Sequence, residues 1–314
     1  MKINRPYLLS LHPTMQCDYN CFNCYLKKDE DDSIEKSPEF FLKLIEVAKK
    51  VGMTEVAMAV NFVEKKKDFQ LLDDPSDVWD QVDKNVYYFN WVKNKCKEVG
   101  LTFTATVNYD FITNYKGHID FKDIELMSIS INDFVTSTEE KKNEAIRTMK
   151  ELKEHIPNIN CNILLSPNMV KQLNAGLDQE ILEVADTIYL LFSEPLYIPL
   201  EKAYEQIRNL KSTVLTMIDD RVLLDTCIKR EMGMTGGICA KHEQIFVNPY
   251  GEIKKCSFDT RDLFKLKKPE DLEHVYANLY PPAPLETCDL INGKNLAERK
   301  LKLKTEREEN VKKG

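Results

Sequence analysis

Three closely spaced cysteines near the N-terminus carry the clearest chemical signal in this sequence of 314 residues. Cys17, Cys21 and Cys24 stand in the run Cys-Asp-Tyr-Asn-Cys-Phe-Asn-Cys, shortly after an apolar segment over 7–11. Three thiolates at this spacing can bind three irons of a cubane iron–sulfur cluster and leave the fourth iron without a protein ligand. A small molecule can bind at such an iron, so the pattern predicts a site for redox chemistry.

A structural zinc site is the alternative for the same residues, because three close cysteines and one remote ligand can also bind zinc. Zinc knuckles usually use two close pairs of ligands. The next cysteine after Cys24 is Cys96, which falls inside a predicted helix. The spacing therefore favours the iron–sulfur cluster over zinc.

The CxxxCxxC spacing after a predicted first strand resembles the radical S-adenosylmethionine (SAM) superfamily. The resemblance implies that the open iron of a 4Fe-4S cluster binds the amino and carboxylate groups of SAM. It further implies that the reduced cluster cleaves SAM to a 5'-deoxyadenosyl radical, which abstracts hydrogen from a substrate. The cofactor would supply this chemistry and the protein would position it. A flavodoxin- or ferredoxin-type protein is the electron donor that such chemistry implies.

A second group of cysteines lies in the last third of the chain. Cys239 is followed after eleven residues by Gly251 and after four more by Cys256. This resembles the Cys-x(9–15)-Gly-x4-Cys signature of the SPASM and twitch extensions of radical SAM enzymes. The resemblance implies an auxiliary 4Fe-4S cluster with four thiolates, Cys227 and Cys288 completing the set. Structural zinc in the same ligands is the alternative.

The elements that must position these residues alternate between strand-like and helix-like segments through the first two thirds of the chain, which predicts βα units around a parallel sheet. We expect strands over 7–13, 54–61, 101–108, 124–132, 158–165 and 186–193, and helices over about 38–50, 84–99, 138–155 and 177–184.

Polar residues alternate with apolar ones inside these strands, as Ser128, Ser130 and Asn132 do in the fourth. Parallel strands covered on both faces are normally apolar throughout. The alternation therefore predicts an α/β fold, a partial (β/α)6 TIM-type barrel whose polar inner face lines a wet cavity and whose outer face packs on helices. Active sites of such folds lie at the carboxyl ends of the strands. Cys96 and Cys161 are interpreted as buried core thiols.

Eight residues are candidates to bind the cofactor. The adenine of SAM is expected against the segment from Phe22 to Tyr25. Where the family often has Gly-Gly-Glu-Pro after the second strand, this chain reads Ala-Val-Asn-Phe-Val-Glu, so Asn61 and Glu64 are the candidates for the SAM amino group. Positions on the strands assign Ser130, Asn132 and Asn162 to the ribose and carboxylate, and Asn108 to the cavity wall. No catalytic residue is assigned.

The absence of those glycines leaves a second outcome open, since glycine permits close approach of the backbone to a ligand. A differently tilted SAM would yield a 3-amino-3-carboxypropyl radical and methylthioadenosine in place of 5'-deoxyadenosine.

From about residue 213 the pattern changes to an antiparallel one. The segments 243–247 and 252–258 flank Asn248-Pro249-Tyr250-Gly251, which is typical of a hairpin turn. A helical stretch is expected near 269–279. We therefore predict a radical SAM partial barrel over 1–212, a twitch- or SPASM-like auxiliary-cluster extension over 213–293 and a charged tail over 294–314.

The composition is that of a soluble globular protein, with 43% hydrophobic and 30% charged residues. The net charge of -7 argues against a nucleic-acid surface spread over the whole fold. No apolar run is long enough for a signal-peptide core or a membrane span. We therefore expect a cytoplasmic protein, and there the nine cysteines indicate metal binding rather than disulfides.

The function expected by resemblance is that of a radical SAM oxidoreductase or transferase that modifies a ribosomally made peptide. One alternative is a dehydrogenase or isomerase of a sugar- or amino-acid-like small molecule. An alternative of another class is a zinc-stabilised binding module without enzymatic activity.

Overall fold

A computed structural model of the chain describes residues 6–17, 34–60, 83–132, 135–192, 205–211, 220–224, 244–254 and 264–278. Its strands form one ten-stranded sheet in the order β10-β9-β8-β1-β2-β3-β4-β5-β6-β7. Their bounds are β1 (Leu8–Leu11), β2 (Glu55–Val60), β3 (Thr102–Asn108), β4 (Leu126–Ile131), β5 (Asn158–Leu165), β6 (Thr187–Phe192), β7 (Val222–Leu224), β8 (Gln244–Val247), β9 (Glu252–Lys254) and β10 (Phe264–Lys265).

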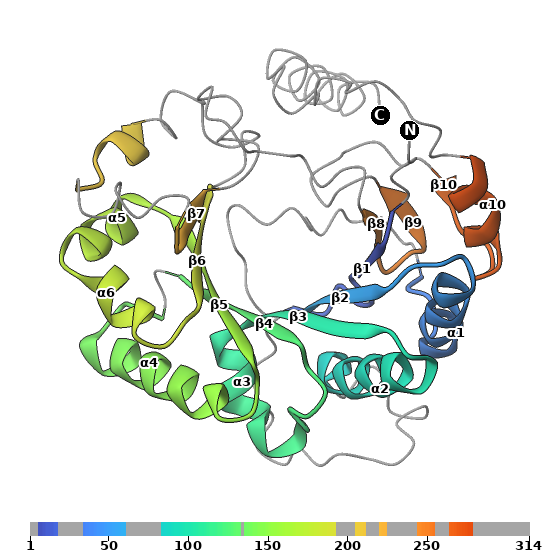
Figure 1. Cartoon of the computed structure of the whole chain (residues 1–314), viewed down its shortest axis with the longest axis horizontal. Coiled ribbons are helices and arrows are strands. Elements are labelled where there is room, and N and C mark those ends of the chain that lie inside the picture. Colours follow the sequence, from blue (N-terminus) through green and yellow to red (C-terminus); the bar gives the residue numbers. More distant parts are fainter. Residues whose placement is uncertain are drawn as a thin grey trace, which may run out of the picture.

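The sheet is curved into an open arc (Figure 1). All neighbouring strands from β8 through to β7 pair in parallel, whereas β8, β9 and β10 pair antiparallel. No pairing joins β7 to β10 among the described residues, so the described sheet is not closed. The parallel arc confirms the partial barrel predicted from the sequence.

Helices cover the outer side of the arc (Figure 1). None of the helices within the described ranges is both long and apolar enough to cross a bilayer. Their bounds are α1 (Pro38–Lys50), α2 (Lys84–Val99), α3 (Tyr109–Tyr115), α4 (Glu139–Lys153), α5 (Pro167–Asn174), α6 (Leu177–Leu182) and α10 (Asp271–Asn278).

Side-chain caps mark where several of these helices begin. The carboxylate of Asp83 accepts a hydrogen bond from the Asn85 N–H at the start of α2, and the Ser166 hydroxyl accepts one from the Met169 N–H at the start of α5. These bonds satisfy N–H groups that have no partner inside the helix. Gly100 ends α2 in the left-handed conformation, with φ of 72°.

The apolar core lies between the sheet and the helices. One face of the strands carries side chains such as Val107, Ile129 and Ile163, all at most 2% exposed. Phe103 of β3 contacts Phe89 of α2 edge to face, with ring centroids 5.5 Å apart. Burying a side chain of this size stabilises the fold by about 1.5–3 kcal/mol. The other face, free of the helices, carries the polar residues.

The predicted elements are confirmed: all six strands and all four barrel helices lie within two residues of the expected bounds. Two short helices, α3 and α5, were not predicted. The first follows β3 without a break, and its cap residue Asn108 makes no side-chain capping bond, so no local signal marks it. The second does have a sequence signal in Ser166-Pro167.

The predicted hairpin is confirmed as β8 and β9, which pair antiparallel around the turn 248–251. The sequence did not predict that β8 also pairs in parallel with β1. The hairpin therefore continues the barrel sheet beyond its first strand. The expected domain boundaries near 212 and 293 lie outside the described residues, and the division into three parts stays a prediction.

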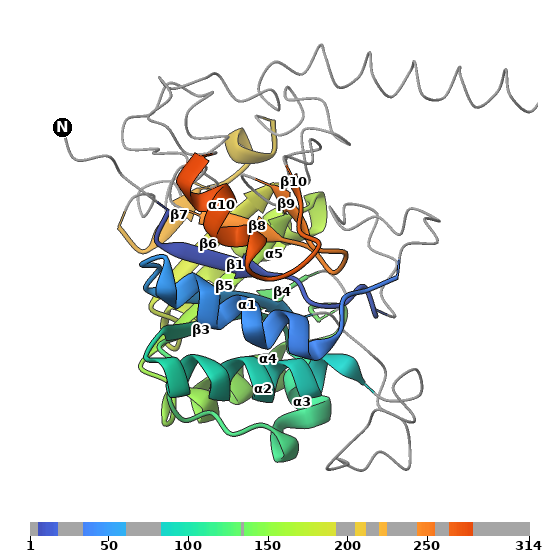
Figure 2. The ribbon, with the colours of Figure 1, turned by 90° about the vertical axis from the view of Figure 1, so that its right-hand side faces the viewer.

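The predicted helix near 269–279 is confirmed as α10, which lies against α1 (Figure 2). The Tyr276 hydroxyl donates a buried hydrogen bond to the Pro6 carbonyl, 3.1 Å away. Lys50 of α1 pairs with Glu273 of α10 at 2.9 Å. These contacts hold the helix beside the start of β1.

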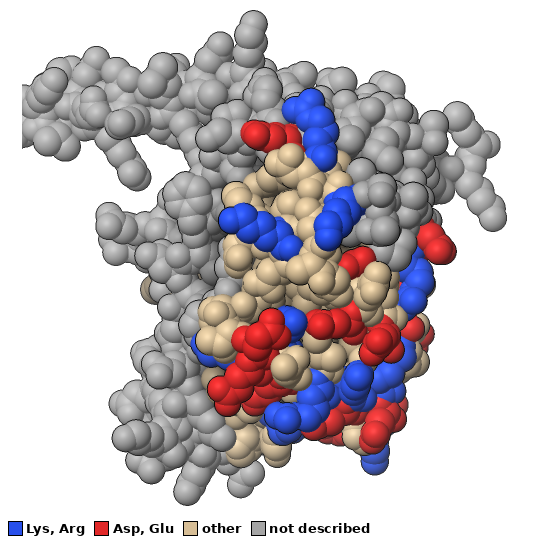
Figure 3. All heavy atoms as spheres, turned by 90° about the vertical axis from the view of Figure 1, so that its left-hand side faces the viewer, with Lys and Arg blue, Asp and Glu red and all other residues tan. Residues whose placement is uncertain are grey.

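The outer face over α4 and α6 carries acidic and basic side chains intermixed (Figure 3). Lys142 lies 2.8 Å from Glu139 and 3.2 Å from Glu180, and Lys150 lies 3.8 Å from Glu183. Such exposed pairs each contribute about 0–1 kcal/mol. The mixture of charges is typical of a solvated surface and provides no basic stripe on this face.

Candidate functional site

A row of polar side chains crosses the sheet, level with the carboxyl end of β3. Strand pairing sets Asn108 of β3 beside Ser130 of β4, and Ser130 beside Asn162 of β5. Tyr189 of β6 pairs with Asn162 and continues the strip. Paired residues on neighbouring strands share a face at a strand spacing of about 4.8 Å. The polar strip, as we call these four residues, is half-buried and therefore reachable by a ligand.

The polar strip carries amides, a hydroxyl and a phenol. Burial raises the pKa of Tyr189 above its ordinary value, so the phenol stays neutral at physiological pH. A second row lies one pleat deeper on the same face, where Asn160 and Ser128 are buried. Its members are paired in the order Thr106, Ser128, Asn160 and Thr187. The polar inner face predicted from the alternation is thus present across four strands.

Cys161 belongs to the opposite face. It lies between Asn160 and Asn162 on β5, and its fully buried side chain is part of the apolar core. Cys96 is likewise buried in α2. Burial raises the pKa of Cys96 to about 12 and that of Cys161 well above its ordinary value. Both interpretations as core thiols are confirmed.

Asn132, a candidate contact for SAM, lies one residue beyond β4 and takes part in a turn. Its side-chain Oδ1 accepts a hydrogen bond from the Val135 N–H at 3.2 Å, and its carbonyl accepts one from the Thr136 N–H at 3.2 Å. The amide oxygen therefore shapes the backbone after β4. Of the four strand candidates, Asn108, Ser130 and Asn162 are the ones brought into one row.

Cys17 follows the carboxyl end of β1 and is half-buried. The backbone between them continues the sheet, since the His12 N–H donates to the Val247 carbonyl of β8 at 2.9 Å. Cys17 thus lies beyond the carboxyl end of β1.

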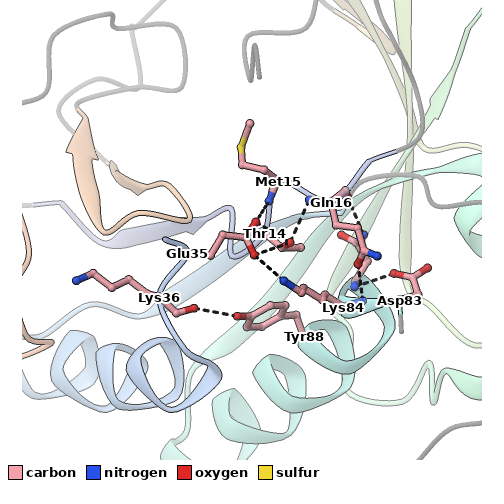
Figure 4. Close-up of polar contacts among 9 residues, drawn as sticks. Thr14, Met15, Gln16, Glu35, Lys36, Asp83, Lys84 and Tyr88 are labelled. Atoms are coloured by element: carbon pink, nitrogen blue, oxygen red, sulfur yellow. Dashed lines mark hydrogen bonds and ion pairs between the residues drawn. The ribbon is translucent and has the colours of Figure 1, made fainter. Parts of the chain in front are cut away.

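Thr14 and Met15, two of the three residues before Cys17, are held by a glutamate that follows the cysteine motif in the sequence (Figure 4). Glu35 Oε1 accepts hydrogen bonds from the Met15 N–H at 2.6 Å and the Thr14 hydroxyl at 3.0 Å. Glu35 Oε2 pairs with Lys84 Nζ of α2 at 3.1 Å. The Glu35 clasp, as we call Thr14, Met15, Glu35 and Lys84, joins three segments of the chain.

Gln16, next to Cys17, is anchored on α2 through both its side chain and its backbone. Its Oε1 accepts a hydrogen bond from the Lys84 N–H at 2.8 Å, and its carbonyl accepts one from Asn85 Nδ2 at 3.1 Å. The Lys84 N–H belongs to the first turn of α2 and has no acceptor inside the helix, so Gln16 Oε1 serves as its acceptor. Gln16, the residue before Cys17, is therefore held by two hydrogen bonds from α2.

Asp83 caps α2 beside these contacts and is only 2% exposed. Burial raises the pKa of this carboxyl, and its hydrogen bonds with Tyr115 and Asn85 oppose that rise only in part. The residue is a structural cap, and it is the first described residue after 61–82.

Lys36, next to Glu35, contacts the β8–β9 turn and α2. Its N–H donates to the Pro249 carbonyl at 2.8 Å, and its carbonyl accepts from the Tyr88 hydroxyl at 3.3 Å. In the turn, Asn248 Oδ1 accepts from the N–H groups of Tyr250 and Glu252 at 3.0 and 2.9 Å. The segment after the first cysteine motif and the hairpin of the second group thus meet directly.

The remaining candidates lie outside the described residues: Cys21, Cys24, Cys227, Cys239, Cys256 and Cys288 among the ligands, and Phe22, Tyr25, Asn61 and Glu64 among the SAM contacts. Within the described ranges, no three His, Cys, Asp or Glu side chains are close enough to share a metal ion.

The described part of the site fits the iron–sulfur cluster that the motif implies. Cys17 is half-buried, and its preceding backbone is fixed. Cys21 and Cys24 lie in sequence between Cys17 and Glu35, whose carboxylate holds Thr14 and Met15. Thiolates are the ordinary ligands of such clusters.

The Glu35 clasp was missed from the sequence. Glu35 and Lys84 are two charged residues in a chain that is 30% charged, and no spacing rule connects them. Gln16 adjoins the motif, but nothing local marks it as a cap for a helix that begins at Lys84. Only the Asp83 cap at the start of α2 had a local signal.

No protein-family model matches the sequence, and the curated proteins contain no match either. Among solved structures, SuiB of Streptococcus suis bound to its precursor peptide SuiA has a TM-score of 0.59 and 16% identity over 89% of this chain and 65% of SuiB. SuiB bound to S-adenosylmethionine has a TM-score of 0.56 and 15% identity over 89% of this chain and 64% of SuiB. This chain therefore spans less than two thirds of SuiB.

A second similar protein is anSMEcpe with bound AdoMet (S-adenosylmethionine) and the Cp18Cys peptide. It has a TM-score of 0.51 and 14% identity over 87% of this chain and 81% of its own. The resemblance drawn from Cys17, Cys21 and Cys24 is thus confirmed at the level of the fold: this chain shares its open barrel with two proteins that were solved with S-adenosylmethionine bound.

Proposed function

We propose that this chain is a radical SAM enzyme that binds S-adenosylmethionine at a 4Fe-4S cluster held by Cys17, Cys21 and Cys24. The observation that carries the proposal is the position of Cys17, which follows the carboxyl end of β1 in a sheet that carries the polar strip. Ligands of parallel βα folds bind at the carboxyl ends of the strands. The fold shared with SuiB and anSMEcpe supports the proposal.

When bound, the reduced cluster would supply one electron that cleaves SAM to methionine and a 5'-deoxyadenosyl radical, and a flavodoxin- or ferredoxin-type donor would replace that electron. The chain's own residues bind and orient the reactants. Asn108, Ser130 and Asn162 offer both donors and acceptors, which suit the hydroxyls of a ribose and a carboxylate. Asn61 and Glu64 are proposed for the SAM ammonium, and the segment from Phe22 to Tyr25 for the adenine.

A ribosomally made peptide is the substrate class that we propose. SuiB was solved with its precursor peptide and anSMEcpe with a peptide, and both share the barrel of this chain. Hydrogen abstraction from such a peptide would lead to an oxidoreductase or a transferase outcome, depending on the bond that forms next.

An auxiliary 4Fe-4S cluster is proposed in the extension, with Cys227, Cys239, Cys256 and Cys288 as ligands. The confirmed hairpin supports it, because β8 follows Cys239 in the sequence, β9 precedes Cys256, and Gly251 closes the turn between them with φ of 78°. Four thiolates would leave no iron of this cluster for a substrate.

A sugar- or amino-acid-like small molecule is the second candidate substrate. The polar strip favours it, because Asn108, Ser130 and Asn162 form an uncharged row that can hydrogen-bond to hydroxyl and amide groups.

The first test is anaerobic reconstitution with iron and sulfide, followed by SAM, dithionite and chromatography of the nucleosides. We expect 5'-deoxyadenosine from the wild type and none from Cys17→Ala. Cys96→Ala, which removes a thiol buried in α2, is the matched control and should keep both the iron and the product.

The other outcomes separate the alternatives. Methylthioadenosine would indicate the 3-amino-3-carboxypropyl route, and bound zinc without labile sulfide would indicate a binding module. For the substrate class, lysate fractions are added to the reaction. Stimulation that protease treatment abolishes supports a peptide, whereas stimulation by a protease-resistant small-molecule fraction supports the second candidate.

A further inference from the structure

We propose that Glu35 is a positioning residue for Cys17, and that the Glu35 clasp closes the base of the cysteine segment before iron binds. This inference rests on the proposed function. Its geometry is a single carboxylate with three donors: the Thr14 hydroxyl at 3.0 and 3.2 Å, the Met15 N–H at 2.6 Å and Lys84 Nζ at 3.1 Å. Figure 4 shows these donors converging on Glu35 from β1's extension and from α2.

The burial of the clasp distinguishes it from a surface ion pair. The side chains of Glu35 and Lys84 are 20% and 14% exposed, and Thr14 is fully buried. Hydrogen bonds to a charged group are stronger than neutral ones, and partial burial reduces their screening by salt. Removing the Glu35 carboxylate would leave its partly buried donors without this acceptor. Leaving a buried donor unsatisfied costs more free energy than removing both partners of a hydrogen bond.

The place of the clasp in the sequence gives it a function for the cluster ligands. Cys21 and Cys24 lie between Cys17 and Glu35. Joining the two ends of a chain segment removes the entropic cost of bringing them together later. Ligand groups that are already held in place lose less freedom when they bind. Glu35 therefore acts on iron binding through the backbone of Met15, two residues before Cys17.

Lys84 and Gln16 make the arrangement specific to Cys17. Lys84 binds Glu35 with its side chain and Gln16 Oε1 with its backbone N–H. The N-terminus of α2 thus fixes the segment at two points, at Glu35 and at the residue next to Cys17.

The test compares how fast the reconstituted protein releases iron to a chelator. We expect Glu35→Gln and Lys84→Met to release iron roughly tenfold faster than the wild type, as expected for the loss of one charge-assisted hydrogen bond. Glu46→Gln is the matched control, because Glu46 is likewise bound through both carboxylate oxygens, to Lys43 at 2.6 Å and Lys95 at 3.1 Å, but on the outer surface.

Two further readouts separate positioning from general stability. Thermal unfolding of the iron-free proteins identifies variants that are simply less stable, and the electron paramagnetic resonance spectrum of the reduced cluster reports its ligand geometry. We expect altered spectra for Glu35→Gln and Lys84→Met while the iron-free proteins stay folded, and an unchanged spectrum for Glu46→Gln.

The inference is overturned if both clasp variants release iron at the wild-type rate, or if all three variants accelerate release equally. A wild type that reconstitutes with zinc or with no cluster instead overturns the proposed function itself, and the two failures are thereby distinguished.

Discussion

The backbone N–H of Lys36 donates a hydrogen bond to the carbonyl oxygen of Pro249, 2.8 Å away. Lys36 adjoins the Glu35 clasp, and Pro249 lies in the turn between β8 and β9. A Cβ on Gly251 of the same turn would lie 3.0 Å from Cε of Lys36 and 3.1 Å from the carbonyl oxygen of Leu266. Lys36, which follows the first cysteine motif in the sequence, thus packs closely against the turn between β8 and β9.

Gly251→Ala should lower the free energy of unfolding by about 1–2 kcal/mol, because φ of 78° disfavours a side chain and the new Cβ would meet the Leu266 carbonyl. Urea denaturation measures the change. Gly117→Ala is the control, since a Cβ at Gly117 meets nothing within 4 Å, and its effect should be near zero. An equal effect of both changes would contradict the fit between the turn and Lys36.

Asp83→Asn should make the stability less dependent on pH. Burial raises the pKa of Asp83 in the folded chain above its value of 3.8 in the unfolded one. The folded chain therefore binds more protons between these two pKa values, and its stability falls as the pH rises through that window. Asparagine is an equally good helix cap but does not ionise.

The measurement for Asp83→Asn is urea denaturation below pH 3.8 and at pH 7. The variant should gain stability relative to the wild type at the higher pH and not at the lower one. A loss of stability at both pH values would mean that the contacts of the carboxylate outweigh its burial.

Asn162→Ala should weaken the binding of SAM to the reconstituted protein about three- to tenfold, the equivalent of one hydrogen bond. Titration calorimetry measures the dissociation constant. Asn158→Ala is the matched control, because Asn158 lies on the same strand and face at the amino end, where its Nδ2 donates to the Glu125 carbonyl. Equal losses of affinity would place the SAM site away from the polar strip.

Lys93→Met should lower the free energy of unfolding by about 2–3 kcal/mol, since the change removes buried hydrogen bonds to a charged group. Lys93 is 3% exposed, and its Nζ donates to the carbonyls of Asp120 and Lys122 at 2.7 and 3.3 Å. Lys97→Met, on the same helix, removes an exposed pair with Asp123 and should change little. Chemical denaturation compares the two, and a similar loss for both would contradict the buried role of Lys93.

Local sequence patterns were sufficient to predict the first six strands of the barrel, but not β7 or the pairing of β8 with β1. The alternation through Ser128 and Ser130 predicted both the strand and its polar face, because side chains on a strand alternate between its two faces. The strand β7 is only three residues long and has too few positions to show a pattern. The pairing of β8 with β1 joins segments far apart in the chain, and no local preference encodes such a partner.

For the candidate site, residue type and strand position were sufficient to predict which polar side chains lie on the strands, but not the contacts between distant segments. Strand register brings Asn108, Ser130 and Asn162 into one row, and their assignment as SAM contacts stays a prediction. Asn132 was assigned to the same group, yet its Oδ1 binds the Val135 N–H, since asparagine after a strand readily bonds the backbone of a turn. Glu35 was missed because its partners are set by the tertiary fold.

The parallel pairing of β1 with β8 also determines the order in which the protein is completed during synthesis. β1 is synthesised well before β8, and the edge of β1 that pairs with β8 stays without this partner until residues 244–247 have been made. An unpaired edge is a site at which strands of other chains can add. The backbone that leads to Cys17, and the Lys36 contact with Pro249, therefore reach their final partners only late in translation, after most of the barrel has been synthesised.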